Sequence, residues 1–513
     1  MIFHRFRRPT RNFSMRGVIT ALALFVASDI AHAADPDVII VGAGLAGLST
    51  AYRLNKEGKS VLILELTSHI GGRIRTASYP GKVAAEVGLE EFWAGNPSLG
   101  IFQELKIPME KSATAFSSFF YQGKLQAFTQ NANQEFLSSL LSAEEMKAYK
   151  KWDRKMVGFH DKLQRSPLGQ SLMKLQDISF ADWVRKTGGL PNKVQEFIRI
   201  ESEPEYGTSW EAISALDGIA EWHIFSGKGS PSFHVVGGNQ RAALALAENI
   251  GPNRILLNQQ VTNIQSLPQG VVVTATDTAD FKQHIYHAKY AVTTVPLFRL
   301  YEIQFDPPVS EEVNQAIQTQ TWGSYFTAHV IVDAKASRFW AINGKSVLPI
   351  ISDGPLGVIY GGNDEAGESR TPPETVMLNL LVNGNHAERF NARTGGMDAI
   401  QALLIEEFEK IWPGFALHIK KMVFYRYHPR AIASWPIGRS RFDALSEAMR
   451  KPQGRIYFAG DFTEGTHSDG AAHSAIRVVQ DILMREKENA DGNLTGDQSG
   501  YGRARTGLPV AMP

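Results

Sequence analysis

Three glycines near the N-terminus have the spacing of a loop that holds a phosphate group. Gly42, Gly44 and Gly47 form a G-x-G-x-x-G pattern between an apolar run and a helix-forming stretch. Glycines let the backbone turn tightly and approach a pyrophosphate, and the N-terminus of the following helix offers free N–H groups and a positive dipole end. The chemistry that this pattern predicts is dinucleotide binding, provided that the neighbouring segments agree.

The neighbouring segments are those that a dinucleotide-binding fold requires. The apolar run DVIIVGAG predicts a buried parallel strand, and LAGLSTAYRLNKEG predicts a helix that stops at Gly58. A second apolar strand, SVLILE, ends in Glu65, whose carboxylate is placed to accept hydrogen bonds from ribose hydroxyls. An acid at this position favours FAD or NAD over NADP.

The next residues, ELTSHIGGRIRT, contain Gly71, Gly72 and Arg73, and they resemble the E-x-x-x-x-x-G-G-R signature of the flavin-containing amine oxidase superfamily. In that superfamily the double glycine and the arginine run along the pyrophosphate and the flavin edge. Further pieces resemble the superfamily in the same order, from about residue 37 to about residue 483. They are an E-x-G element (Glu86, Gly88), VVGGNQ, AVTTVP, SWPIG and the closing stretch GRIYFAGDFTEGTHSDGAAHSAIRVVQDIL.

The resemblance also implies roles for residues farther along the chain. Val261 stands where the adenine-side strand passes the cofactor, and Gly460 with Asp461 follows an apolar strand in the closing stretch. Asp461 would bond a ribityl hydroxyl or the pyrophosphate region, and the helix that follows would begin under the flavin. The cofactor implied is FAD.

The fold class implied is α/β, with a glutathione-reductase-like Rossmann FAD-binding domain and an interleaved α+β substrate domain of mixed sheet and helices. Residues 37–100, 235–310 and 420–485 would form the FAD-binding domain, and residues 101–234 and 311–419 the substrate domain. Within the latter, LSAEEMKAYKKWDRKMVGFHDKLQ predicts an amphipathic helix, YFTAHVIVDA and PETVMLNLLVNG predict strands, and residues 102–128 show no buried-strand signature. The tail, 486–513, has the composition of a disordered segment.

The N-terminus has the three parts of a secretory signal. Residues 1–33 contain five arginines before the apolar run VITALALFVA, and they end in the small-x-small site AHA. The run is too short to cross a bilayer comfortably, so we expect a signal peptide at 1–33 that is cleaved after Ala33. An uncleaved membrane anchor is the alternative. The expected location is the periplasm or the exterior.

Composition excludes several classes of protein. Of 513 residues, 43% are hydrophobic and 20% charged, which is ordinary for a globular protein, and no basic face for nucleic acid is indicated. The chain has no cysteine, which excludes thiolate catalysis, a cysteine-bound metal and a cysteinyl link to a cofactor. We therefore expect non-covalent FAD. No H-E-x-x-H or comparable spacing supports a metal site.

In the superfamily a lysine often holds a water beside flavin N5, after a G-S-x-x turn. The matching stretch, GSYFTAHVIV, has Thr327 at that place. Threonine bonds water but brings no positive charge near superoxide. We therefore expect oxygen to be a poor electron acceptor and a carrier such as a periplasmic cytochrome to replace it. The alternative alignment gives this work to His329.

Two aromatic residues often flank the substrate nitrogen in the superfamily. The stretch AIASWPIG resembles F-S-N-W-P-V-G, with Ile432 at the place of the first aromatic and Trp435 retained. Ala471 stands at the place of the second aromatic, and it is also expected on the cofactor side. Non-aromatic residues at both positions predict a bulkier substrate or a cage built elsewhere. Such a cage would draw on Trp210, Trp222 or Phe225, although each is more often a core residue.

Two polar clusters complete the set of candidates. THSDGAAH brings His467, Asp469 and His473 to the segment expected to pass the flavin, where His467 is the candidate base; helix capping by Ser468 or Asp469 is the alternative. ESEPEYGTSW places acids in the substrate domain that would attract a cationic amine or form a solvated loop. These acids are Glu201, Glu203 and Glu205.

Together these features predict an exported FAD-dependent oxidoreductase that oxidises the C–N bond of an amine by hydride transfer and is reoxidised by oxygen or an electron carrier. No arginine occurs between Arg75 and Arg154, which disfavours an amino-acid substrate. The first alternative is a flavin dehydrogenase or desaturase acting on a non-amine. The second is a flavin-bearing electron-transfer or binding protein. The catalytic candidates are Thr327, Trp435 and His467; a homodimer is left open.

Overall fold

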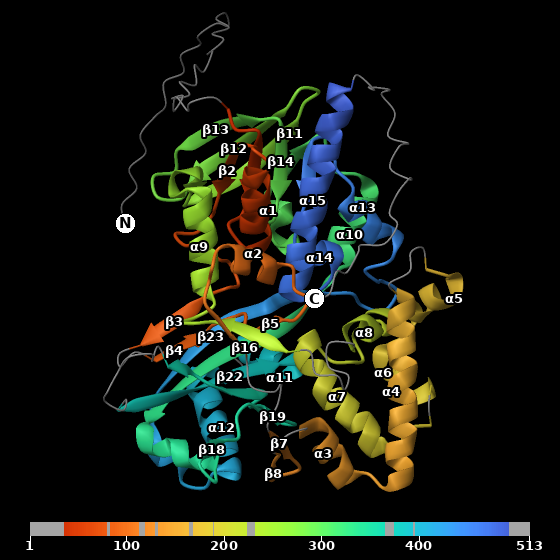
Figure 1. Ribbon diagram of the computed structural model, residues 1–513, viewed down its shortest axis with the longest axis vertical. Helices are drawn as coiled ribbons and strands as arrows, with labels where there is room; N and C mark the ends of the chain where they lie inside the picture. The colour runs from red at the N-terminus through yellow and green to blue at the C-terminus, as the bar shows by residue number, and fades with distance from the viewer. Residues whose placement is uncertain are drawn as a thin grey trace, which may run out of the picture.

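The computed structural model describes residues 35–79, 83–111, 118–128, 132–163, 168–187, 189–222, 231–364, 374–392 and 395–491. The predicted signal segment, Phe225 and the last residues of the predicted tail lie outside these ranges. Figure 1 shows two stacked parts, one built on a parallel sheet and the other on a larger mixed sheet.

The strands that flank the glycine loop lie in a parallel sheet. β1 (Val38–Val41) pairs with β2 (Val61–Leu64) on one side and with β14 (Tyr290–Thr293) on the other. β10 (Ile255–Leu256) and β24 (Ile456–Phe458) complete the order β10-β2-β1-β14-β24. Every residue of β1, β2 and β14 is buried, because both faces of the sheet are covered.

Successive side chains of these strands point to opposite faces, and each face has its own core. Val38 and Ile40 pack against the helices α1 (Leu45–Lys56), α9 (Gln240–Ile250) and α15 (His467–Ala490). Ile39 and Val41 pack against a smaller mixed sheet and two helices. That sheet has the order β13-β12-β11-β15 (Gln283–Ala288, Val271–Asp277, Gln259–Ser266, Gln304–Asp306), and the helices are α10 (Glu311–Thr319) and α13 (Ala444–Arg450).

The second part is a seven-stranded sheet in the order β23-β16-β22-β20-β19-β7-β8. Its two long strands, β16 (Thr321–Asp333) and β23 (Ile419–Ser434), pair antiparallel and extend toward the parallel sheet. The predicted strands at 325–334 and 373–384 are thereby confirmed as parts of β16 and β22. The others are β22 (Thr375–Asn383), β20 (Val358–Gly361), β19 (Ile350–Ser352), β7 (Ser118–Tyr121) and β8 (Lys124–Ala127).

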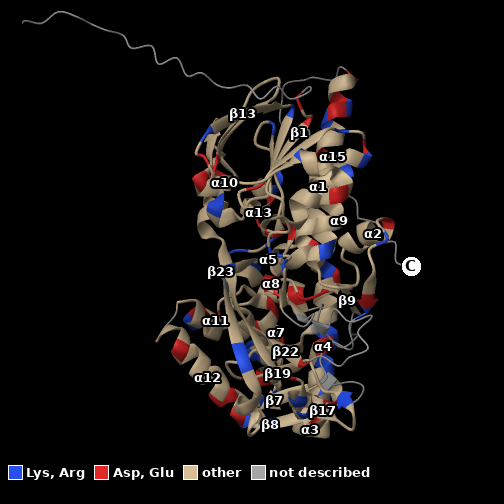
Figure 2. Ribbon diagram, turned by 90° about the vertical axis from the view of Figure 1, so that its left-hand side faces the viewer, with Lys and Arg blue, Asp and Glu red and all other residues tan. Residues whose placement is uncertain are grey.

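Helices cover both faces of this sheet as well. One face packs against α11 (Gly384–Asn391) and α12 (Gly396–Ile411). The other packs against a helical group that includes the predicted amphipathic helix, α4 (Ala143–Leu163). The rest of that group is α3 (Ala132–Leu140), α6 (Phe180–Thr187), α7 (Asn192–Tyr206) and α8 (Ala215–Trp222). In Figure 2 basic and acidic residues are interspersed along the ribbon rather than gathered on one face.

Three sequence expectations differ from the structure. The third segment of the FAD-binding domain was predicted to begin at residue 420. Residues 419–434 instead form β23, which pairs with β16 in the seven-stranded sheet. β7 is a fully buried strand within 102–128, where none was expected. α15 continues to Ala490, five residues into the predicted disordered tail.

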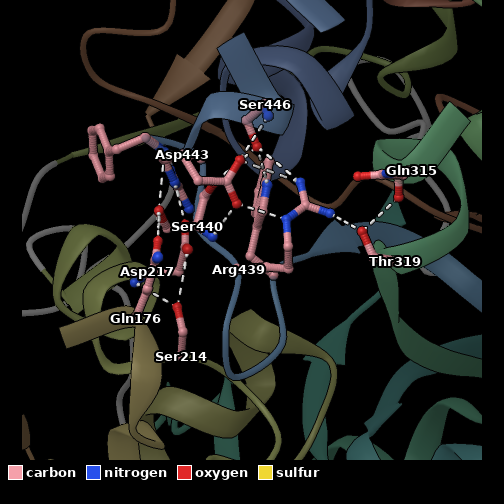
Figure 3. Close-up of polar contacts among 12 residues, drawn as sticks. Gln176, Ser214, Asp217, Gln315, Thr319, Arg439, Ser440, Asp443 and Ser446 are labelled. Carbon is pink, nitrogen blue, oxygen red and sulfur yellow. Dashed lines mark hydrogen bonds and ion pairs between the residues drawn. The ribbon is translucent and has the colours of Figure 1, made fainter. Parts of the chain in front are cut away.

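The loop between β23 and α13, residues 435–443, joins the two parts, and we call it the junction loop (Figure 3). Arg439 Nε donates to Asp443 Oδ2 at 2.6 Å, and the same guanidinium contacts Thr319 of α10. Ser440 Oγ donates to Gln176 Oε1 at 2.9 Å, on the side of the helical group. Hydrogen bonds to both parts hold the loop in place.

Among the residues that the structure describes, none of the helices combines the length and apolar character that crossing a bilayer requires.

Candidate active site

A single cavity of about 590 Å³ connects the two parts, a volume typical of small-molecule and cofactor sites. At one end it is lined by Gly42, Gly44 and Glu65, at the carboxyl ends of β1 and β2. At the other end it is lined by Tyr325 and Thr327 of β16, and by residues of β20. The predicted nucleotide loop and the predicted lysine position therefore face one space.

The three glycines of the loop are required for different reasons. Gly42 has φ of +105°, a conformation that glycine adopts without strain. A Cβ on Gly47 would lie 2.0 Å from the carbonyl oxygen of Gly42, so this glycine, which does not line the cavity, lets α1 pack closely on the loop. A Cβ on Gly44 would meet nothing within 4 Å and would project into open space at the N-terminus of α1.

Glu65 is held by the glycine loop itself. Its Oε2 accepts a hydrogen bond from the backbone N–H of Ala43 at 2.7 Å, and its Oε1 accepts from the N–H and hydroxyl of Thr67 at 2.9 and 2.7 Å. These bonds fix the carboxylate at the cavity wall, where it retains lone pairs for further donors. The position agrees with the predicted ribose contact.

Arg73 and Asp461 form a bidentate ion pair beside the cavity. Both guanidinium Nη atoms donate to the carboxylate at 2.7 Å, and Nη1 also donates to the carbonyl of Ala431 at 2.8 Å. Burial opposes the charge of Asp461, but Arg73 and backbone hydrogen bonds together outweigh it, and the pKa of Asp461 lies below its usual value. Asp461 is 1% exposed and does not line the cavity, whereas Arg73 and Gly460 do. Asp461 therefore positions Arg73, and its predicted contact with the cofactor stays a prediction.

The remaining predicted cofactor residues, Gly72, Val261 and Ala471, all line the cavity. Gly72 has φ of +57° and lies against the loop, since its Cβ would be 3.3 Å from Gly44 Cα. Val261 comes from β11 and Ala471 from the second turn of α15. The open cradle at Gly44, the fixed carboxylate of Glu65 and the cation of Arg73 are a donor and acceptor set that fits a dinucleotide with a ribose and a pyrophosphate.

Thr327 lines the cavity, and its Oγ1 donates to the carbonyl of Val87 at 3.0 Å. The oxygen still has lone pairs to accept a bond from water. The alternative residue, His329, does not line the cavity. It is fully buried between the Tyr79 hydroxyl and the Glu86 carbonyl, and burial lowers its pKa to about 4.

Trp435 is not at the cavity, so its predicted catalytic role is wrong. It is 0% exposed, its Nε1 donates to Ser446 Oγ at 3.0 Å, and Arg441 stacks 5.0 Å from its ring centroid. It is the first residue of the junction loop and anchors that loop in the core beside the parallel sheet. Trp210 and Trp222 belong to the core of the helical group and also do not line the cavity.

The two predicted cage positions, Ile432 and Ala471, do line the cavity, and neither is aromatic. Aromatic residues that sequence reasoning missed line it instead. Tyr325 precedes Thr327 by two residues on β16, and this alternation along a strand was a signal that could have found it. The other lining aromatics are Trp93, Phe298, Trp322 and Tyr360, and no sequence signal marked them.

Three carboxyl groups line the end of the cavity near Tyr325, namely Glu90, Glu91 and Glu205; we call this end the acidic chamber. Burial raises the pKa of each, and for Glu205 the value is about 7. Glu90 Oε1 accepts a hydrogen bond from Asn379 Nδ2 at 2.6 Å. The paired acids of GLEEFW were visible in the sequence but were not selected.

The stretch around Glu205 is the last turn of α7 and not a solvated loop. Only Glu205 of its three candidate acids faces the cavity. Glu201 is 3% exposed, and Glu203 forms an ion pair with Arg199 at 2.7 Å. The predicted attraction of a cation therefore rests on Glu205 together with Glu90 and Glu91.

His467 is the first residue of α15 and lines the acidic chamber beside Ser468. Its Nε2 lies 3.8 Å from Glu205 Oε2. Asp469 and His473 lie on the same helix but not on the cavity wall, and no cap hydrogen bond from a side chain is made at this helix start. The predicted catalytic histidine and the predicted acid are thus brought together.

Comparisons with known proteins agree with this architecture. Polyamine oxidase 1 of Zea mays is 22% identical over 495 residues, which cover 90% of this chain and 92% of that protein. The structure of cyclohexylamine oxidase from Brevibacterium oxydans matches with a TM-score of 0.72 at 19% identity, over 88% of this chain and all of that one. Putrescine oxidase, solved with putrescine bound, matches with a TM-score of 0.72 at 20% identity, over 88% of this chain and 99% of that one.

The family profile described as "Flavin containing amine oxidoreductase" matches residues 45–483, which is most of the chain. The match begins at the first residue of α1, directly after the glycines that line the cavity, and ends in α15, so it includes residues of both ends of the cavity. The chain therefore belongs to the flavin-containing amine oxidoreductase family and is an oxidoreductase of the amine oxidase type.

Proposed function

We propose that this chain binds FAD non-covalently and oxidises the C–N bond of a cationic amine. The observation that carries the proposal is the continuity of the cavity, which runs from the glycine loop to the acidic chamber. When bound, the flavin supplies a hydride acceptor for the carbon beside the amine nitrogen, and the imine formed is hydrolysed by water. The lack of cysteine supports non-covalent binding.

The chain's own residues hold both partners. The N-terminus of α1 and Arg73 would bind the pyrophosphate, and Glu65 the ribose. At the other end, Glu205 and its neighbours offer carboxyl groups to an ammonium group. Because their pKa values are raised by burial, these acids can remain neutral while the chamber is empty and ionise when a cation enters.

Several carboxyl groups in one chamber favour a substrate with more than one positive charge. This inference gains support from the names of similar proteins, which include a polyamine oxidase and a putrescine oxidase. The chamber argues against the alternative of an apolar non-amine substrate, because an apolar ligand would offer these buried polar groups no hydrogen-bond partner. A diamine or polyamine is the substrate class that the geometry supports best.

The electron acceptor and the location are further parts of the proposal. Thr327 presents a hydroxyl and no positive charge, which supports slow reaction with oxygen and reoxidation by a carrier protein. The N-terminal signal pattern supports export to the periplasm or the exterior. N-terminal sequencing of the protein from a fractionated host checks cleavage after Ala33, and gel filtration checks whether a homodimer forms.

Anaerobic mixing of the purified flavoprotein with 1,4-diaminobutane, butylamine and a set of amino acids tests the function. We expect the visible flavin band to bleach with the diamine, and the concentration for half-maximal rate to be at least tenfold lower for the diamine than for butylamine. Bleaching by both amines at equal concentrations would refute the polycation class. No bleaching by any nitrogen compound would refute amine oxidation and favour a flavin-bearing electron-transfer protein.

Air admitted after bleaching tests the acceptor. Slow return of the colour is expected for the wild type, and faster return for Thr327→Lys, which places a cation at the cavity wall. Fast return in the wild type would show that oxygen is the acceptor.

A further inference from the structure

An amine that enters the acidic chamber as an ammonium ion has no free electron pair on its nitrogen. That pair is needed to stabilise the carbon as hydride leaves, so a proton must first pass to an acceptor within hydrogen-bond reach. Thr327 is not a base at neutral pH, and an acid of the chamber that took up this proton would become neutral and no longer hold the cation. Among the residues that the structure describes, the remaining group with proton-accepting chemistry on the wall of this chamber is the imidazole of His467.

The placement of His467 is unusual for a structural residue. Its backbone φ is +66°, a left-handed conformation that residues other than glycine seldom adopt. Its side chain is 19% exposed, and its Nε2 is a buried nitrogen without a hydrogen-bond partner among the residues that the structure describes. A strained backbone that holds an imidazole at a cavity wall, with one ring nitrogen buried and unpartnered behind that wall, is a frequent feature of functional sites.

Two carboxyl groups on different helices face this nitrogen. Glu205 Oε2 of α7 lies at 3.8 Å and Glu221 Oε2 of α8 at 3.9 Å. Both distances are too long for direct hydrogen bonds but short enough to stabilise a positive charge on the ring. Glu205 shares the chamber with the substrate, whereas Glu221 lies behind the wall.

Glu221 has the charge state that this task requires. It pairs with Arg441 of the junction loop, whose Nε also donates to Asp217 Oδ1 at 2.6 Å. Burial opposes ionisation, but Arg441, a positive charge on His467 and a hydrogen bond with Thr466 together outweigh it, and the pKa of Glu221 lies below its usual value. Asp469, on the same helix as His467, has a pKa raised by burial, but it does not line the chamber and so does not meet the substrate.

We propose that the imidazole of His467 accepts the proton of the substrate ammonium group at Nδ1, the ring nitrogen other than the buried Nε2, with Glu221 stabilising the imidazolium from the Nε2 side; this role rests on the amine oxidation proposed above. One N–H bond of the ammonium breaks, one N–H bond forms on the ring, and the electron pair stays on the amine nitrogen. No further reactant is consumed. Glu205 holds the ammonium group within reach during the transfer.

Anaerobic bleaching of the holoenzyme by 1,4-diaminobutane is compared for the wild type, His467→Gln and the matched control His473→Gln. The control changes a histidine on the same helix that does not line the cavity. At pH 7.5 we expect a loss of about 100-fold or more in bleaching rate for His467→Gln and no loss for the control. The loss should shrink to less than about tenfold by pH 10, because the amine then loses its proton to water. His467→Asn is the second variant, since asparagine tolerates the left-handed backbone.

A second measurement does not depend on turnover. ¹⁵N-histidine NMR of the holoenzyme is recorded with tert-butylamine, which has no hydrogen on the carbon beside nitrogen, and with tetramethylammonium, which has no proton to give. We expect tert-butylamine to convert one ring nitrogen to the protonated form, tetramethylammonium not to do so, and the signal to be absent in His467→Gln.

An equal loss at all pH values, or no change in the ring nitrogen signal, would overturn the proposal. The two proposals fail in different ways. If no amine bleaches the wild type while tert-butylamine still protonates His467, amine oxidation is refuted and proton acceptance stands. If bleaching is normal in both variants of His467, amine oxidation stands and the role of His467 is refuted.

Discussion

Glu205 provides the most quantitative test of the acidic chamber. In the unfolded chain its carboxyl loses its proton near pH 4.5, whereas in the folded protein burial raises the pKa to about 7. Between these pH values unfolding releases a proton, so the stability of the fold decreases as the pH rises. The decrease is complete above pH 7 and absent below pH 4.5. Replacement by glutamine removes the ionisation and with it the decrease.

The size of the effect follows from the two pKa values. Their difference corresponds to about 3 kcal/mol, because one pKa unit corresponds to about 1.36 kcal/mol. Glu205→Gln is therefore expected to raise Tm by roughly 3 °C at pH 8 relative to the wild type, for a protein with this many ordered residues. At pH 4.5 the two Tm values should coincide.

The assay is thermal unfolding of the flavin-loaded protein without amine, followed by circular dichroism from pH 4.5 to pH 8.5. The control is Glu248→Gln, at an exposed position of α9, which should leave the difference near zero at every pH. The same Glu205 variant should bind a diamine at least tenfold more weakly, since it cannot supply the counter-charge. A Tm that falls at pH 8, or a gain that does not depend on pH, would refute the reasoning that burial keeps Glu205 protonated.

The flavin site and the junction loop give three further predictions. Gly44→Val should fold with an unchanged circular dichroism spectrum but lose flavin absorbance, because its side chain would occupy the open cradle. Gly47→Ala should lose flavin absorbance and also have a lower Tm, because its Cβ would clash with the loop backbone. Arg73→Gln should lower the free energy of unfolding in urea by about 3 kcal/mol, because it leaves the buried carboxylate of Asp461 without its counter-charge. Adding Asp461→Asn should restore part of that loss. Losses that simply add up in the double variant would contradict the ion pair. Trp435→Phe should cost about 1–2 kcal/mol while the diamine concentration for half-maximal bleaching stays unchanged; a tenfold rise would return Trp435 to the active site.

The nucleotide-binding half was predictable because its signals are local. A buried parallel strand, a glycine loop and a helix follow one another within a few turns, so Gly42, Gly44 and Glu65 could be placed from spacing alone. Asp461 was located in the right segment, but its partner Arg73 is 388 residues away, and no local pattern shows that a carboxylate is already paired. The same limit explains Trp435, whose motif suggested the active site while its contacts belong to the junction loop.

The substrate end was predictable only in part, because its wall is assembled from separated strands and helices. Thr327 and Tyr325 share a face of β16, so the strand alternation could have linked them. Glu205 was named as a candidate acid, with a solvated loop as the alternative. The stretch around it is helical and mostly buried, because α7 packs between the sheet and α8. The sequence pattern of α7 alone does not reveal this core. Tyr360 reaches the cavity from β20, which is placed by its pairing with β22.

The replacement of the expected aromatic pair by Ile432 and Ala471 has a consequence for how an amine is held. Aromatic rings attract a cation by about 0.5–2 kcal/mol, depending on how dry the site is. A desolvated carboxylate close to an ammonium group contributes more, at the cost of being buried in the empty site. The raised pKa values of Glu90, Glu91 and Glu205 reduce that cost, since the acids can stay protonated until a cation enters. Recognition by carboxyl groups rather than rings makes affinity depend on pH and on the number of charges of the substrate, and it leaves room at the cavity wall that two aromatic rings would fill.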